Sequence, residues 1–185
     1  NKNIESGGLI CKSIAEVVET CDIISILVPD QVMGNVYKET IDPYLHDGQT
    51  LLFSHGYNIH YNIITPPNHV NVIMVAPSGA GSEVRKQYKK GIGIPGLIAV
   101  HQDYTGDSFD LALSYSKGIG LTRLGVFKST FKEETETDLF GEQIILTGGI
   151  PKLIQSSYKV LLEAGYSPIT AWFVCYYELK TIVNL

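Results

Sequence analysis

The chain has 185 residues, of which 44% are apolar and 18% are charged, and its net charge is −5. These values are typical of a folded globular protein with room for one domain, or for one domain and part of another. The acidic balance and the lack of a basic run argue against nucleic acid or an anionic membrane as a partner. The apolar runs are too short to span a bilayer. Three widely spaced cysteines form no zinc or disulfide pattern, which indicates thiols in a reducing compartment.

Short apolar runs alternate with amphipathic segments through the first two-thirds of the chain. Ser13 and Glu16 are the two ends of a capping-box pattern, which predicts the start of a short helix. Strands are expected at Asp22–Val28, Thr50–Ser54, Val70–Ala76, Leu97–His101 and Leu124–Lys128, and helices near Gln31–Glu39, Glu83–Lys90 and Ser108–Lys117. This alternation predicts an α/β fold with a parallel sheet covered by helices.

The pattern changes to consecutive helices after Thr130, which forms a second capping box with Glu133. Three helical segments are expected at Phe131–Leu146, Lys152–Ala164 and Pro168–Val183, divided by Gly148-Gly149 and by Gly165-Tyr166. A change from strand–helix alternation to helices alone indicates a domain boundary. We therefore divide the chain into residues 1–129 and residues 130–185.

The segment Phe131–Gln143 contains several carboxylates within the first of these helices. Asp138 and Glu142 are four residues apart, which places them on one face of a helix, where like charges repel by about 0.2–0.5 kcal/mol. Oxygen ligands of this kind suit Mg²⁺, so the spacing fits either a magnesium site or a solvated acidic face. We interpret the neighbouring Glu133, Glu134 and Glu136 as charges that complement the positive end of the helix dipole.

Three sequence blocks extend this interpretation. The segments FKEETETDLFGEQ at Phe131–Gln143, FSHGYNIHY at Phe53–Tyr61 and VNVIMVAP at Val70–Pro77 closely resemble ketol-acid reductoisomerase. The resemblance implies a Rossmann-type NADP-binding domain and then an all-helical domain that binds metal and substrate. It also implies that both domains are truncated, before Asn1 and after Leu185, so that the isolated chain is expected to be inactive.

The resemblance implies a reaction as well. Family members use Mg²⁺ to catalyse alkyl migration in 2-acetolactate or 2-aceto-2-hydroxybutyrate, and NADPH then reduces the product to a 2,3-dihydroxy acid for branched-chain amino-acid synthesis. The expected cofactors are NADPH and two Mg²⁺ ions, and the expected partner is a small acetohydroxy acid. Homo-oligomers formed through the helical domain and a bacterial-type cytoplasmic location are also implied. Because residue 1 is Asn rather than Met, a leader to an organelle stays open.

The resemblance also implies roles for individual residues, where positions of this sequence match the motifs of the family. Asp138, Glu142 and Glu178 match metal ligands, His55 matches an active-site histidine, and Asp30, Gln31, Val32, Met33 and Gly81 match cofactor contacts. His55 and the Asp30–Met33 segment also follow expected strand ends, where open α/β sheets bind ligands. The plain alternatives are a surface charge for Glu178 and an ordinary strand–helix turn for the cofactor segments.

Three positions depart from the family pattern. Val174 stands where a second glutamate is expected four residues before Glu178, and an alkyl group cannot bind a cation. Ser78 replaces a common lysine and Ala80 a proline in the loop after the third strand. These departures support an alternative function, that of a degenerate relative that acts as a binding or assembly module. The preference for NADPH or NADH also stays open, because the loop that would read the 2′-phosphate is not recognisable in the sequence.

Overall fold

The computed structural model describes residues 8–183 and divides into two compact units. The first unit ends at Thr135 and the second begins at Glu136. The division lies inside one helix, because residues of its first turns are buried in the first unit: Phe131 and Glu134 are each 5% exposed and Thr135 is fully buried.

The first unit is built on a five-stranded sheet with the strands in chain order. The strands are β1 (Ile23–Ile26), β2 (Thr50–Phe53), β3 (Asn71–Pro77), β4 (Gly96–Gln102) and β5 (Val126–Lys128). The first three strands are parallel to one another, and β4 is parallel to β5. The α/β fold is therefore confirmed, and the sheet is mostly parallel.

One pair of neighbours, β3 and β4, runs antiparallel, unlike the wholly parallel sheet that the sequence predicted. The reason lies in the segment after α5 (Gly81–Lys89), where Gly91 and Gly93 adopt φ angles of 77° and 82°. These left-handed conformations suit glycine and turn the chain back toward the end of the sheet that it has just left. As a result β4 starts beside the last residue of β3, with Gly96 opposite Pro77.

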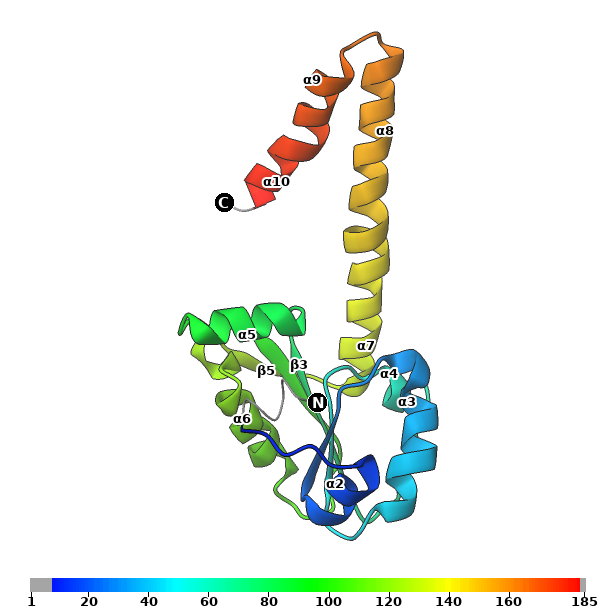
Figure 1. The fold of residues 1–185 in the computed structure, drawn as a ribbon, viewed down its shortest axis with the longest axis vertical. Coiled ribbons are helices and arrows are strands. Elements are labelled where there is room, and N and C mark those ends of the chain that lie inside the picture. Colours follow the sequence, from blue (N-terminus) through cyan, green and yellow to red (C-terminus); the bar gives the residue numbers. More distant parts are fainter. Residues whose placement is uncertain (1–7, 184–185) are drawn as a thin grey trace. The chain divides into compact units, whose positions relative to one another are not determined.

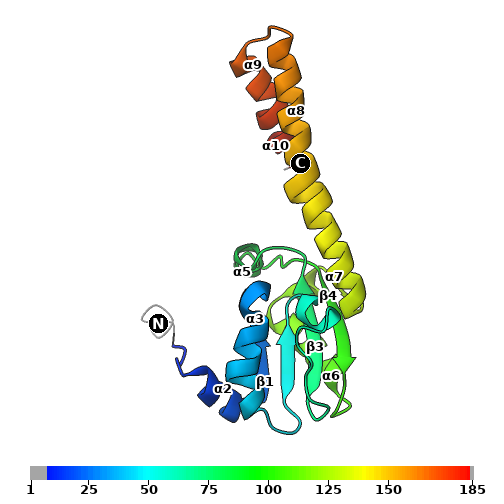
Figure 2. The same ribbon diagram turned by 90° about the vertical axis from the view of Figure 1, so that its right-hand side faces the viewer.

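Helices cover both faces of the sheet (Figures 1 and 2). They are α2 (Ile14–Thr20), α3 (Asp30–Val36), the π-helix η1 (Tyr37–Ile41), the 3-10 helix η2 (Asp42–Tyr44), α4 (Tyr57–His60), α6 (Ser108–Gly118) and the 3-10 helix η3 (Leu121–Arg123). Successive residues of β2 alternate between two apolar cores, as a strand requires. Leu51 and Phe53 pack with Met33 of α3 on one face, and Leu52 packs with Ala112 of α6 on the other.

Both predicted capping boxes have structural support. The side chain of Ser13 accepts a hydrogen bond from the Glu16 N–H, and the Glu16 carboxylate accepts one from the Ser13 N–H. Thr130 Oγ1 likewise accepts from the Glu133 N–H at the start of the next long helix. Local side-chain chemistry therefore fixes where these helices begin.

The second unit consists of helical segments. They are α7 (Phe131–Phe140), which begins in the first unit, the π-helix η4 (Gly141–Gly149), α8 (Ile150–Glu163), α9 (Pro168–Trp172), the π-helix η5 (Phe173–Tyr177) and α10 (Glu178–Val183). The prediction of a break at Gly148-Gly149 is wrong, because Gly149 keeps helical angles of φ −63° and ψ −52°. The predicted break at Gly165 is confirmed by its φ of 84°.

After Gly165 the chain turns back, and α9 and η5 pack against α8. The rings of Tyr158 and Tyr176 meet edge to face at 5.8 Å across this contact. Many apolar side chains of the unit remain exposed, including Leu153, Ile169, Trp172 and Val183. Within residues 8–183, no helix is both long and apolar enough to cross a membrane.

Candidate functional site

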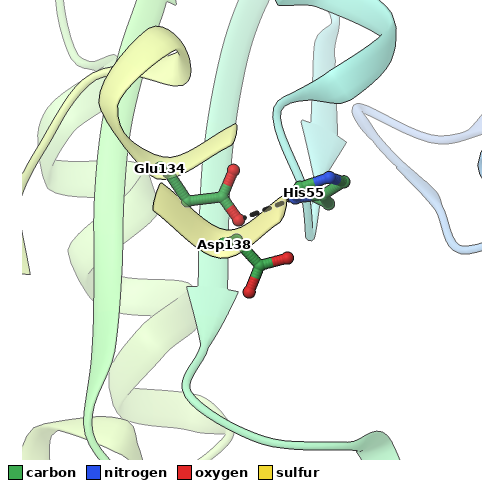
Figure 3. Close-up of side chains that lie close together, drawn as sticks. All are labelled: His55, Glu134 and Asp138. Carbon is green, nitrogen blue, oxygen red and sulfur yellow. Dashed lines mark hydrogen bonds and ion pairs between the residues drawn. The ribbon is translucent and has the colours of Figure 1, made fainter. Parts of the chain in front are cut away.

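The clearest polar contact in the first unit joins His55 to Glu134. His55 follows the carboxyl end of β2, and Glu134 lies in the first turns of α7, 79 residues later in the chain. His55 Nδ1 lies 2.8 Å from Glu134 Oε1 (Figure 3). The Gly56 N–H donates to Glu134 Oε2 at 2.9 Å. One carboxylate thus binds both the ring and the backbone of the segment that carries the histidine.

The absence of a side chain at Gly56 makes this close packing possible. A Cβ at this position would lie 2.5 Å from Thr135 Oγ1 and 2.7 Å from the Phe131 carbonyl oxygen. Phe131 also packs its ring edge to face against Phe53, with 6.3 Å between the centroids. The strand end and the helix therefore meet through an aromatic contact on one side and a glycine on the other.

Glu134 corrects an expectation from the sequence, which treated it only as a charge that complements the helix dipole. Its side chain is buried, and its two oxygens accept the hydrogen bonds described above. A buried carboxylate is stable only when such partners replace water. The sequence contained a usable signal, since Phe131, Glu134, Thr135 and Asp138 have the i, i+3, i+4, i+7 spacing of one helix face.

A second carboxylate lies one turn further along α7. Ligand-type atoms of His55, Glu134 and Asp138 all lie within 4.8 Å of one another (Figure 3). Both oxygens of Glu134 already accept hydrogen bonds, so this residue is suited to orienting the imidazole. Asp138 is exposed, and an exposed carboxylate suits a cation such as Mg²⁺ that keeps part of its water shell. The donor set therefore fits a hydrated metal ion beside an oriented histidine.

Glu142 and Glu178, the other two expected metal ligands, are both exposed. Glu142 is the second residue of η4, and Glu178 is the first residue of α10, directly after η5. Neither belongs to the cluster of His55, Glu134 and Asp138 found among the described residues. Val174 lies in η5 and is 50% exposed, so an alkyl group occupies a surface position there.

The expected cofactor contacts lie near the carboxyl ends of β1 and β3. Asp30, Gln31, Val32 and Met33 form the first turn of α3, and the side chain of Met33 is buried in the core. Only backbone groups of Met33 could therefore meet a ligand. Asp30 Oδ1 accepts a hydrogen bond from the Asn58 amide at 3.0 Å, which ties this turn to α4.

A cavity of about 650 Å³ opens at the same edge of the sheet. Its lining includes residues at or just after the ends of β1, β2 and β3, namely Leu27, Ser54 and Pro77, together with Gly79 and Gly81. Of the expected cofactor contacts, Gly81 lines this cavity, and the residues of the Asp30–Met33 turn do not. Ser78 and Ala80 lie in the same exposed loop before α5, where the Ser78 N–H donates to the Pro95 carbonyl.

A second histidine near this site has an altered pKa, although its side chain lies at the exposed surface of β4. The ring of His101 packs edge to face against Phe131, with 5.5 Å between the centroids. Removal of water from the ring lowers the pKa of His101 below its ordinary value of 6.5. His101 therefore favours its neutral form beside the helix that carries Glu134.

Comparisons with known proteins agree on one protein family for both units of the chain. The profile described as "Acetohydroxy acid isomeroreductase, NADPH-binding domain" matches residues 1–125. The profile described as "Ketol-acid reductoisomerase, C-terminal domain" matches residues 131–185. Together they account for nearly the whole chain.

Individual relatives agree with these profiles. The chain is 55% identical over all 185 residues to the ketol-acid reductoisomerase (NADP(+)) of Methanocaldococcus jannaschii, of which it covers 56%. It superposes on an NADH-preferring ketol-acid reductoisomerase from an uncultured archean with a TM-score of 0.94 and 43% identity, covering 100% of this chain and 56% of that one. The chain thus spans little more than half the length of these relatives.

A more distant solved structure shares the fold alone. This is a semialdehyde dehydrogenase NAD-binding protein from Cupriavidus necator, with a TM-score of 0.72 and 16% identity over 100% of this chain and 69% of that one.

Proposed function

Because the chain belongs to the ketol-acid reductoisomerase family, we propose that it supplies the greater part of the catalytic site of such an enzyme. The intact protein would convert 2-acetolactate or 2-aceto-2-hydroxybutyrate to the matching 2,3-dihydroxy acid. The reaction joins an alkyl migration to a reduction by a nicotinamide cofactor.

The observation that carries the proposal is the contact between His55 and Glu134, with Asp138 one turn along the helix. With Nδ1 held by the carboxylate, Nε2 is the acceptor nitrogen of the neutral imidazole. An imidazole oriented in this way can accept a proton from the substrate hydroxyl or relay it through water. Glu134 stabilises the imidazolium that would form, since a carboxylate beside a charged ring favours the charged form.

Asp138, Glu142 and Glu178 are the proposed magnesium ligands. When bound by these residues, Mg²⁺ would supply electrophilic polarisation of the substrate oxygens. The exposure of all three carboxylates leaves room for water and substrate in the coordination shell. The second of the two expected ions has fewer donors, because Val174 contributes none.

The cavity at the ends of β1, β2 and β3 is the proposed position of the nicotinamide cofactor, with Gly81 as a close backbone contact. The Asp30–Met33 turn would contribute backbone groups. The two relatives named above are described as using NADP(+) and as preferring NADH, respectively, and NADPH is the cofactor proposed for this protein.

We further propose a homo-oligomer formed through the helical unit, supported by its exposed apolar side chains. The three cysteines, Cys11, Cys21 and Cys175, are free, which suits a reducing compartment such as the cytoplasm. The alternative of a degenerate binding module is not favoured, given the 55% identity over the whole chain to a ketol-acid reductoisomerase.

Turnover of 2-acetolactate by the intact protein, with NADPH oxidation followed at saturating Mg²⁺, tests the function. Replacement of His55 by Gln should lower kcat by about 10²–10⁴-fold, the usual contribution of a positioned acid–base group. Replacement of the exposed His46 by Gln is the control and should leave kcat unchanged. Absence of turnover in the unmodified protein, or full turnover by His55→Gln, would contradict the proposal.

A further inference from the structure

The helix that carries Glu142 changes its hydrogen-bond pattern one residue before Glu142. From Gly141 to Gly149 the chain forms nine residues of π-helix, between α7 and α8. π-Helical segments are usually single turns, and they often occur at functional sites. The length of η4 and its position at a proposed metal ligand both require a physical reason.

Two glycines at the end of η4 provide that reason. A Cβ added to Gly148 would lie 2.0 Å from the Gln143 carbonyl oxygen, and a Cβ added to Gly149 would lie 2.3 Å from the Ile144 carbonyl oxygen. Each of these oxygens belongs to the residue five positions earlier, which is the spacing of a π-helix. Any other side chain at either position would force this backbone to change.

Gly141 at the other end of the same segment is different. A Cβ added there meets nothing within 4 Å, so this glycine is not required by its surroundings. Glycine is a poor helix former compared with alanine, and two adjacent glycines inside a continuous helix are unfavourable by themselves. Of the three glycines in η4, Gly148 and Gly149 are thus the two whose lack of a side chain fits the π geometry.

The π geometry acts directly on the backbone of Glu142. Thr147 Oγ1 donates a hydrogen bond of 2.6 Å to the Glu142 carbonyl oxygen, again over five residues. In an α-helix, residues four apart nearly coincide on the surface, so Asp138 and Glu142 would lie one above the other. A turn that contains more residues rotates Glu142 around the axis relative to that position. The separation and direction of the two carboxylates thus depend on the π geometry of η4.

We propose that Gly148 and Gly149 are positioning residues for the magnesium ligand Glu142, because they keep the helix in the π conformation that orients this carboxylate toward the ion. This role rests on the proposed function, in which Asp138 and Glu142 share Mg²⁺. Gly148 and Gly149 do not touch the ion. Their effect is transmitted through the helix backbone and through the hydroxyl of Thr147.

Calorimetric titration of the intact protein with Mg²⁺ tests the proposal. Gly148→Ala and Gly149→Ala should each weaken Mg²⁺ binding by about 10–100-fold, the usual effect of disturbing the support of a metal ligand. Gly141→Ala is the matched control within the same segment and should bind Mg²⁺ as the unmodified protein does. The affinity for NADPH should stay unchanged in all three variants. Unchanged Mg²⁺ affinity in both Gly148→Ala and Gly149→Ala would overturn the proposal.

Changes at Thr147 test the same backbone route without adding a clash. Thr147→Val removes the hydroxyl that donates to Glu142 and should weaken Mg²⁺ binding, while Thr147→Ser keeps the hydroxyl and should restore it. If the alanine variants do not fold, the two Thr147 variants test the proposal by themselves. Equal Mg²⁺ affinities of Thr147→Val and Thr147→Ser would contradict the positioning role.

Glu142→Gln separates failure of this inference from failure of the proposed function. If Glu142→Gln binds Mg²⁺ normally, Glu142 is not a ligand, and both the metal site and the positioning role are wrong. If Glu142→Gln loses Mg²⁺ while the glycine and threonine variants keep it, only the positioning role is wrong.

Discussion

At the residue scale, the contact between His55 and Glu134 shows how burial changes the structural role of an acidic residue. Glu133 and Glu134 are neighbours in the sequence, yet the Glu133 side chain is exposed and Glu134 is 5% exposed. Glu133 Oε2 accepts a hydrogen bond from Ser129 Oγ at the surface, whereas Glu134 binds His55 and the Gly56 N–H. The two residues therefore form a natural pair of test and control.

Replacement of Glu134 by Gln should lower the free energy of unfolding by about 1.5–3 kcal/mol, because buried donors lose a charged acceptor. Replacement of Glu133 by Gln should change it by less than about 0.5 kcal/mol, as expected for a surface site. Urea denaturation of the two variants measures the difference. Equal losses in both variants would show that burial of Glu134 has no special energetic role.

Replacement of Val174 by Glu tests the main departure from the family pattern. The position is half exposed on η5, so a longer charged side chain fits without disturbing a core. A carboxylate here would add a hard oxygen donor four residues before Glu178, and Mg²⁺ binding by the intact protein should become tighter. Calorimetry with Mg²⁺ checks this, and Val174→Gln is the control for side-chain size. An equal gain with Gln would argue against metal coordination by the carboxylate.

The lowered pKa of His101 predicts a pH dependence of stability. The folded protein holds this pKa below 6.5 by removing part of the water around the ring, so protonation favours the unfolded chain. The stability contribution of neutral His101 is therefore complete above about pH 6.5 and is lost as the pH falls through the lower folded pKa. Between about pH 7 and pH 5, the urea midpoint of His101→Gln should fall less than that of the unmodified protein. An equal fall of the urea midpoint in both proteins would exclude His101 as the source of the pH dependence. Replacement of the exposed His46 by Gln serves as the control.

At the element scale, single glycines decide how the secondary structures meet. Gly91 and Gly93 reverse the chain into β4, and Gly148 and Gly149 permit a π-helix. Gly56 lets α7 approach the end of β2. At each of these positions a side chain would be unfavourable, because the backbone has a positive φ or because another atom occupies the space of the Cβ. The sequence by itself shows only that the residue is glycine.

Replacement of Gly56 by Ala should separate α7 from the end of β2. The added methyl would lie 2.5 Å from Thr135 Oγ1, and overpacking of this kind costs about 1–3 kcal/mol. The shift should also lengthen the contact between His55 and Glu134 and reduce kcat of the intact protein. Urea denaturation and turnover measure the two effects. Gly118→Ala at the end of α6, where a Cβ meets nothing within 4 Å, is the control.

At the scale of the whole molecule, the two units differ in how they bury apolar side chains. The first unit has an apolar core on each face of its sheet. In the second unit, by contrast, Ala171 is the sole buried hydrophobic residue among the described positions 136–183, and many large side chains are exposed. An exposed apolar surface of this extent supports the proposed self-association.

Charged replacements on the second unit should therefore weaken self-association. Leu153 and Ile169 are 67% and 70% exposed, and we expect Leu153→Lys and Ile169→Lys to shift the intact protein toward the monomer. Sedimentation velocity measures the distribution. Leu124→Lys changes a 57% exposed leucine of the first unit and should leave assembly unchanged. Assembly that withstands both changes in the second unit would refute a role for this surface.

Local patterns determined much of the fold. The strands, the capping boxes at Ser13 and Thr130, and the turn at Gly165 follow from short-range signals, namely apolar periodicity, hydroxyl caps and a glycine at a helix end. The sequence also predicted site roles for His55 and Asp138, through residue type, spacing and a long block of family resemblance, and folding brings these two residues together. These features depend on neighbours within about one or two turns of chain.

Tertiary structure decided the features that depend on distant atoms. The antiparallel pairing of β3 with β4 and the burial of Glu134 involve segments far apart in the sequence. The same is true of the need for glycine at position 56, because atoms of α7 occupy the space where its side chain would lie. Whether a charged group is a surface charge or part of a site depends on the water that folding removes from it. The sequence gives the residue type and spacing, whereas this loss of water is set by packing in three dimensions.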